Sequence, residues 1–243
     1  MKTDTRFKWG VPDSGFEWGT LKGDRQLRWR SESTAGWVER RVPPIGLFRK
    51  FAALGLSAVR DESIRERKDM VAIQAFANRY GDILIEPGRG AERKTDAIGN
   101  PPGIKRRFAT LNQWRNEIRR MRGAVSLWDR RNANEDAVRL EVREGLYWIT
   151  DKALINGTTP SHALAHLDQN LKLFVQPMNL LAFMWFTLAR LVAGEIEERP
   201  CEMFDICGNY VYVGSGWGLQ RGDTTTCGET CRKRKNRQRA PPR

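Results

Sequence analysis

All four cysteines of the 243-residue chain fall in one stretch near its carboxyl end. They are Cys201, Cys207, Cys227 and Cys231, in the spacing C-x5-C…C-x3-C. Four thiolates can enclose Zn²⁺ tetrahedrally, and a site closed by four protein ligands is structural rather than catalytic. Although the first gap is wider than in most zinc motifs, the clustering predicts a structural zinc site with these four cysteines as ligands.

The alternative is four reduced thiols without a metal. The loop between the two cysteine pairs is rich in glycine, so it has little core of its own, and a bound metal would supply the missing stability. Met1–Gly10 contains no apolar signal segment, so we expect the chain to stay in the cytoplasm. Thiols are reduced there, which favours a metal over disulfides.

A basic run follows the last cysteine directly. It extends from Arg232 to Arg239, contains helix-forming residues and lacks any acid. Held by the zinc site, it would form a basic helix that lies along a phosphate backbone or in a groove. The alternative is a disordered solubilising tail. The candidate nucleic-acid-binding residues are Arg221, Arg232, Lys233, Arg234, Lys235, Arg237 and Arg239.

The charge of the whole chain points to the same class of partner. Forty-two Lys and Arg stand against 29 Asp and Glu, a net charge of +13. Such a surface attracts polyanions, of which nucleic acid is the first candidate, DNA before RNA, and an anionic membrane the second. The alternative is a basic surface without a specific partner. The most apolar stretch, Leu180–Leu188, is far shorter than the roughly 20 residues of a membrane-spanning helix, so no membrane partner is expected.

The elements that position these residues are expected to be mostly helical. Residues 1–44 are interpreted as a Trp- and Gly-rich arm or small β segment, in which Leu27–Arg30 alternates like a strand. Residues 45–199 form the predicted helical domain, with a long loop at about 86–109. Residues 200–243 hold the zinc knuckle and the basic tail. The predicted fold is therefore mainly α, a helical domain followed by a small C-terminal zinc knuckle with a basic helix.

Apolar residues at helical spacing predict the individual helices. The segments are Leu47–Leu54, Asp61–Tyr80 ended by Gly81, Leu111–Trp128, and a central core helix at Met178–Val192. A further helix is expected after Thr159-Pro160, with an apolar stripe of Leu164, Leu167, Leu171 and Phe174.

Two groups of charged residues in these helical zones allow more than one interpretation. The polar face of the Leu111–Trp128 helix carries arginines that either bind phosphates or are simply solvated: Arg115, Arg119, Arg120 and Arg122. The acidic run Glu195, Glu197 and Glu198 is interpreted as solvated rather than as a pair of acid–base catalysts.

Few residues suit enzymatic chemistry. The only histidines, His162 and His166, would share a helix face, but no carboxylate stands between them as in a zinc protease, so ordinary helix surface is expected. The sequence shows no nucleophile elbow, and the Gly-rich stretch Gly214–Gly222 lacks the Lys of a phosphate loop. We therefore predict that the chain is not an enzyme. A hydrolase or nuclease would need an open metal position with an acid or base nearby.

The C-terminal pattern resembles that of a known group of proteins. Cys207-Gly208, a following tyrosine, Arg221-x-Asp223, Cys227 and Cys231-Arg232-x-Arg234 are similar to the C-terminal zinc knuckle of a family of bacterial helical proteins. More distantly, they resemble the CGNR-type zinc finger proteins, which are taken to be transcriptional regulators. The chain departs from the pattern through three extra residues in the first cysteine pair and Gly228 in place of Ser.

These observations favour a zinc-containing nucleic-acid-binding protein, and the resemblance implies a bacterial transcriptional regulator. Its helical part would sense a ligand or form a homodimer. The alternative is a helical ligand-sensing or protein-interaction module whose zinc end is purely structural. Binding that survives charge reversal of Arg232, Arg234 and Arg237 would favour this alternative.

Overall fold

The computed structural model describes most of the chain, with gaps. The described residues are 9–12, 14–21, 23–30, 37–40, 43–58, 60–84, 109–130, 140, 163–167, 173–177, 179–214 and 219–239. Their helices are α1 (Leu47–Ala52), α2 (Glu62–Tyr80), α3 (Leu111–Asp129), α5 (Leu180–Val192), α6 (Phe204–Cys207) and α7 (Glu229–Arg239). The predicted loop at about 86–109 lies outside the described residues, except for Ala109.

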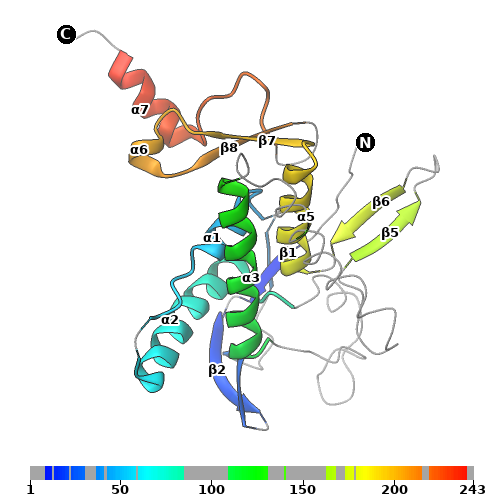
Figure 1. Cartoon of the computed structure of the whole chain (residues 1–243), viewed down its shortest axis with the longest axis vertical. Helices are drawn as coiled ribbons and strands as arrows, with labels where there is room; N and C mark the ends of the chain where they lie inside the picture. Colours follow the sequence, from blue (N-terminus) through cyan, green and yellow to red (C-terminus); the bar gives the residue numbers. More distant parts are fainter. Residues whose placement is uncertain are drawn as a thin grey trace.

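The strands of the described chain form four separate two-stranded antiparallel sheets. The pairs are β1 (Trp9–Pro12) with β4 (Trp37–Arg40), β2 (Phe16–Leu21) with β3 (Asp24–Trp29), β5 (Ala163–Leu167) with β6 (Leu173–Pro177), and β7 (Ile196–Pro200) with β8 (Tyr210–Gly214). Figure 1 shows β7 and β8 lying across one end of the helical body, with α7 projecting beyond them. The helical body confirms the predicted mainly α fold only in part, because the prediction did not include this number of small sheets.

Local capping explains where the long helices begin and end. Asp61 accepts hydrogen bonds from the backbone of Ser63 and Ile64 at the start of α2, and Gly81, at φ 97°, ends that helix. Thr110 forms a reciprocal capping box with Gln113 at the start of α3. The predicted segments 47–54, 61–80, 111–128 and 178–192 are thus confirmed as helices, within a few residues at their ends.

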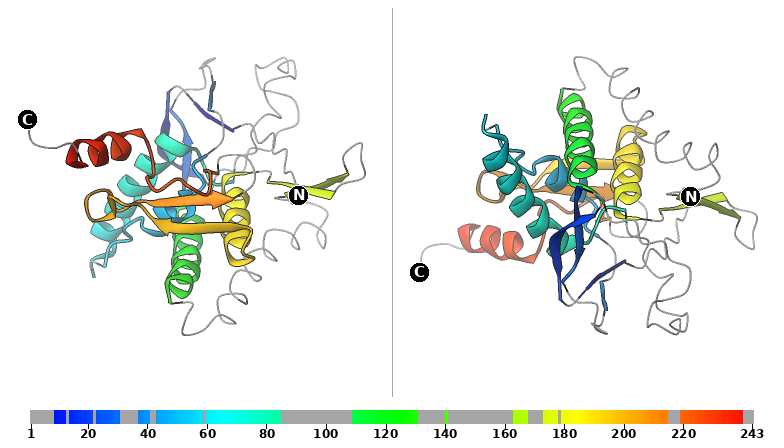
Figure 2. Two further views of the ribbon diagram at one scale, coloured as in Figure 1. Left: turned by 90° about the horizontal axis from the view of Figure 1, so that it is seen from above. Right: turned by 90° about the horizontal axis from the view of Figure 1, so that it is seen from below.

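One hydrophobic core joins the amino-terminal hairpin to the helices. Phe16 and Leu27 of that hairpin are buried in the same cluster as Phe51, Trp114 and Trp185. The hairpin is also tied to α2, because Asn78 accepts a hydrogen bond from the Phe16 backbone and Gln74 donates one to it, both at 2.7 Å. The β segment given as one alternative for residues 1–44 is therefore present in the described part, and this hairpin lies beside α2 (Figure 2).

The helix predicted after Thr159-Pro160 is wrong in the part that the structure describes. Residues 163–167 and 173–177 are the strands β5 and β6, with His166 opposite Phe174. Both segments are short apolar runs, and such runs satisfy the helical and the strand period almost equally well. Thr159, Pro160, His162 and Leu171 lie outside the described residues.

The arginines of α3 are largely engaged within the protein. Arg115 is only 8% exposed and donates to Asp69 at 2.8 Å, so for this residue both earlier interpretations are wrong. Arg122 donates to the carbonyls of Ala52 and Leu54. Arg119 and Arg120 bond to residues of their own helix. No helix among the described residues is long and apolar enough to cross a membrane.

Candidate metal centre

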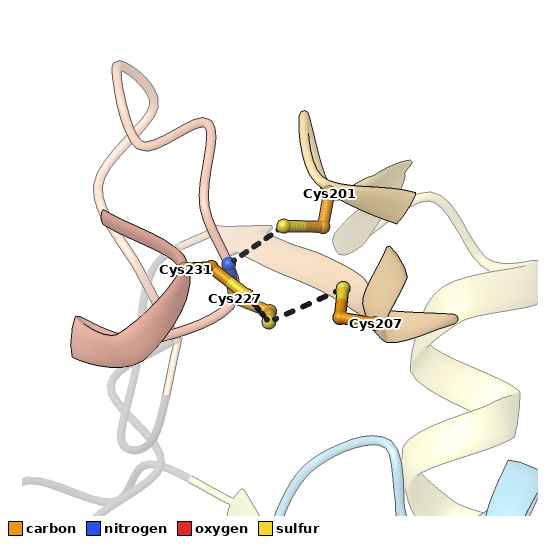
Figure 3. A group of neighbouring side chains, drawn as sticks. All are labelled: Cys201, Cys207, Cys227 and Cys231. Carbon is orange, nitrogen blue, oxygen red and sulfur yellow. Dashed lines mark hydrogen bonds between the residues drawn. The ribbon is translucent and has the colours of Figure 1, made fainter. Parts of the chain in front are cut away.

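The four cysteines converge on one point of the structure. Their sulfur atoms all lie within 4.8 Å of one another (Figure 3). The Sγ of Cys227 is 3.9 Å from that of Cys207 and 3.5 Å from that of Cys231. The predicted ligand set is thus assembled in space, and together these residues can hold a metal ion.

The sulfur separations suit a metal better than a disulfide. Four sulfurs about 2.3 Å from a central ion in a tetrahedron are about 3.8 Å from one another, and the two separations above lie on either side of this value. A disulfide would bring two sulfurs to about 2.05 Å, whereas all four cysteines are free. The remaining sulfur separations are at most 4.8 Å, so the donor set fits a tetrahedral ion after shifts of about 1 Å.

The first pair is brought together by the β7–β8 hairpin. Cys201 directly follows β7, and Cys207 ends the short helix α6. Gly208 then reverses the chain at φ 59°, a left-handed conformation that favours glycine, and β8 returns alongside β7. The wide C-x5-C gap is therefore taken up by one helical turn, which keeps both sulfurs on the same side.

The second pair belongs to the start of α7. Cys227 lies just before this helix and Cys231 lies in its first turn. The backbone N–H of Arg232 donates to the carbonyl of Gly228 at 3.1 Å, which continues the helical hydrogen bonding across the pair. Both cysteines of the second pair thus lie at the start of one helix, and the orientation of α7 is thereby tied to the cysteine cluster.

Backbone N–H groups point at the sulfurs. Cys201 accepts from Met203 at 3.4 Å and from Cys227 at 3.3 Å, and Cys207 accepts from Asn209 at 3.4 Å. Such donors stabilise the negative charge of a thiolate and hold it in orientation. The cluster therefore includes part of the outer hydrogen-bonding shell that a metal-bound thiolate needs.

The thiols differ in acidity because they are crowded. Burial opposes ionisation of Cys207, but the N–H of Asn209 and the neighbouring thiols outweigh it, so its pKa lies below its ordinary value. Burial, with hydrogen bonds to the other thiols, raises the pKa of Cys227. Cys227 favours the thiolate of Cys231, but burial and the remaining thiols raise the pKa of that group as well. Of these three thiols, Cys207 therefore loses its proton most readily, and adjacent negative charges oppose ionisation of the others.

Apolar support around the cluster is small. Cys201 and Cys231 are buried with Met203, Val211 and Val213 in a cluster separate from the main core. So few side chains bury little apolar surface, and a bound metal would contribute much of the folding free energy of this part. We call residues 196–214 and 219–239 the cysteine module.

A buried charge network docks the cysteine module onto the helical body. Arg49 of α1 donates twice to Glu198 of β7, both times at 2.6 Å, and twice to Asp129 of α3. Trp128 donates to the same Glu198 carboxylate. The Glu198 side chain is only 4% exposed, so its interpretation as solvated is wrong. Sequence reasoning missed this network because the two partners stand 149 positions apart.

Aromatic rings complete the junction. Tyr212 of β8 packs edge-on against Phe48 of α1, and the Arg49 guanidinium lies 4.3 Å from the centre of the Tyr210 ring. Burial and the nearby Glu198 raise the pKa of Tyr212, so its hydroxyl stays protonated. A Cβ at Gly46 would come within 2.6 Å of the Tyr212 ring, so only glycine allows this close approach.

The basic residues of α7 fall into two sets. Arg232, Arg234 and Arg237 are exposed, and the described chain provides no partner for their side chains. Lys233 is exposed too, and pairs with Glu229 at 2.8 Å. Lys235 instead points back to the cysteine module, where it donates to Thr225 at 3.0 Å and pairs with Glu202.

The remaining predicted residues are placed as follows. Arg221 is exposed in the loop that follows β8. Arg239 is the last residue of α7, and its side chain lies outside the described part. His166 lies in β5 and so does not share a helix face with His162. Comparisons of the chain with family models, with curated proteins and with solved structures found no match.

Proposed function

We propose that this protein binds nucleic acid through α7, which a structural zinc ion in the cysteine module orients. The observation that carries the proposal is the convergence of four sulfurs within 4.8 Å, two of them at the start of a helix with exposed arginines. Because Cys231 is a ligand in the first turn of α7, the metal and the basic residues belong to one rigid element.

Zinc is the metal that best suits this site. Thiolate ligands select zinc, copper(I) or iron–sulfur centres, and four thiolates in a tetrahedron suit zinc. All four positions would be filled by protein, so the ion would be structural, which supports a role without catalysis. Cys201, Cys207, Cys227 and Cys231 would hold it.

The face of α7 that would contact phosphates follows from helical geometry. Cys231 and Lys235 are four positions apart and both face the cysteine module, which places them on the inner side. Arg232, Arg234 and Arg237 fall on the broad outer arc together with Lys233, which also pairs with Glu229, and this arc is exposed to a phosphate backbone. Lys235 therefore anchors the helix and does not contact phosphate. It is removed from the candidate nucleic-acid-binding residues.

The decisive test is the salt dependence of binding to duplex DNA. The triple variant R232Q/R234Q/R237Q removes three charges without removing a metal ligand. If each arginine contacts one phosphate, the negative slope of log K against log salt should become less steep by about 2.7 for a duplex, or about 2.1 for a single strand. The metal content of the variant should equal that of the unmodified protein.

A matched control separates contact by α7 from net charge. The variant R60Q/R67Q/K68Q loses the same charge from exposed positions on and beside α2. Its salt slope should stay close to that of the unmodified protein. Equal loss of affinity in both variants would mean that only overall charge matters, and the role of α7 would be rejected.

A role in transcription is the most specific part of the proposal. It is supported by the resemblance of Cys207-Gly208, Arg221-x-Asp223 and Cys231-Arg232-x-Arg234 to the bacterial zinc-knuckle family. A regulator discriminates among duplex sequences, so selection from a random duplex pool should enrich a common sequence. If the pool stays random after repeated selection, the regulatory role is rejected, whereas binding of nucleic acid without sequence preference is retained.

A further inference from the structure

A cleft of about 970 Å³ lies between the helical body and the cysteine module. Its walls come from α1, from the carboxyl-terminal half of α3, and from the hairpin β7–β8 with the loops beside it. This volume is at the upper end of the range for small-molecule sites and far exceeds the needs of a bare inorganic anion. The cleft is also distinct from the outer face of α7.

The cleft has an excess of positive charge. Lys50, Arg122 and Arg130 line it, and within the described chain their hydrogen-bond partners are neutral groups: the Tyr80 hydroxyl, two carbonyls near the end of α1, and Ser126. Arg49 lines the cleft as well, but its guanidinium already donates hydrogen bonds to Glu198 and Asp129. Four cations therefore stand against these two carboxylates, which favours an anionic ligand.

The opposite wall is aromatic. Phe204, Tyr210 and Tyr212 of the cysteine module line it, and each is half-buried. Arg49 lies over the Tyr210 ring and Tyr212 packs against Phe48, and the ring surface that remains exposed favours a ligand with a flat ring. Gln220 also lines the cleft, and its buried side-chain oxygen has no hydrogen-bond partner in the described chain. A polar group on a ligand could lower the cost of leaving that oxygen unpaired.

We propose that this cleft binds a nucleotide, with the phosphate near Lys50 and Arg130 and the base against the aromatic wall. Cations for a phosphate, rings for a base and space for both occur together here. The inference is separate from the binding of nucleic acid by α7. Cys227 is part of the cleft wall, so an occupied cleft would contact the element that carries the cysteine cluster.

The first experiment is calorimetric titration of the metal-loaded full chain. The probes are AMP, GMP, CMP and UMP, each compared with its nucleoside and with inorganic phosphate. At least one nucleotide should bind saturably, and about tenfold or more tightly than either of its parts, as expected when one charged contact is worth about 1.4 kcal/mol. Phosphate that binds as tightly as every nucleotide would contradict the role of the aromatic wall.

Paired variants locate the site. K50Q/R130Q changes two exposed cleft residues and should weaken the nucleotide by about tenfold or more. The control R67Q/K68Q removes the same charge from the outer face of α2 and should leave nucleotide affinity unchanged. If both pairs weaken nucleotide binding equally, or if neither pair weakens it, the proposal is wrong.

A nucleotide within a single strand carries the same phosphate and base as a free nucleotide. A third comparison distinguishes these two ligands. In R232Q/R234Q/R237Q, the affinity for the free nucleotide should be retained if the cleft acts independently of α7. If no free nucleotide binds but a single-stranded oligonucleotide does, and K50Q/R130Q weakens it in this variant, the cleft receives a nucleotide from a strand. If neither probe binds, the proposal is wrong, whatever the outcome for duplex DNA.

Discussion

Single residues decide whether the cysteine cluster can work as a metal site. Cys201 and Cys231 are buried, while Cys207 and Cys227 are partly exposed, so the site is closed on one side by the small core of Met203, Val211 and Val213. The serine substitution Cys227→Ser keeps the size of the side chain but removes a thiolate. We expect elemental analysis to find about one zinc per chain, as for a closed four-thiolate site, and its loss in this variant.

The outcome of that measurement can go against the site in two ways. If freshly purified protein contains no zinc and all four thiols react freely, the predicted zinc site is wrong. Full zinc content in Cys227→Ser would show that the ion is held elsewhere. The matched control is Ser126→Ala, a conservative change outside the ligand set, which should keep its zinc.

The acidity of the thiols makes metal binding depend on pH. Cys227 and Cys231 have raised pKa values, so both are protonated near neutral pH and must lose their protons when they bind a metal. Binding should therefore release at least these two protons, and apparent affinity should rise with pH by about a hundredfold per unit for two protons. Calorimetry in buffers of different ionisation enthalpy measures the release directly. Affinity that is independent of pH would argue against thiolate ligation.

The buried charge network should be more sensitive to mutation than an exposed ion pair. Arg49→Met leaves the Glu198 carboxylate buried without its main partner, which costs about 3–5 kcal/mol. Arg25→Met breaks the exposed pair with Glu66 and should cost less than about 1 kcal/mol. Urea denaturation of both variants, with the same metal content, gives the comparison. Similar small losses in both would mean that Glu198 is hydrated in solution.

At the scale of elements, the sequence pattern was a good guide to the helices and a poor one to the strands. Asp61 and Gly81 delimit α2, and Thr110 begins α3, because capping needs only residues close in the chain. The strands β5 and β6 have no such local signal. Their identity depends on pairing with each other, which a stripe of apolar residues does not reveal.

The cysteine module should lose its structure before the helical body does. The small cluster of Met203, Val211 and Val213 offers little stability of its own, whereas α3 and α5 belong to the large core. A chelator should therefore increase amide hydrogen exchange in residues 196–214 and 219–239 while α3 stays protected. Uniform loss of protection would instead mean that the metal holds the whole protein together.

For the whole molecule, the important feature is how the cysteine module sits on the helical body. Arg49, Glu198 and Asp129 join α1, β7 and α3, and the Tyr212 ring packs against Phe48 above Gly46. This junction forms one side of the cleft, and α7 projects beyond the hairpin β7–β8 (Figure 1). A ligand that spans the cleft would therefore contact both parts at once.

The sequence alone was sufficient for the cysteine cluster, for the four long or apolar helices and for the basic helix after Cys231. Each depends on residues that are neighbours along the chain or on one periodic face. Only the tertiary structure could show that Glu198 is buried, that Lys235 faces inward and that a cationic cleft lies beside Tyr210. Burial, pairing and concavity arise between segments far apart in the chain, as with Arg49 and Glu198, and local spacing holds no information about them.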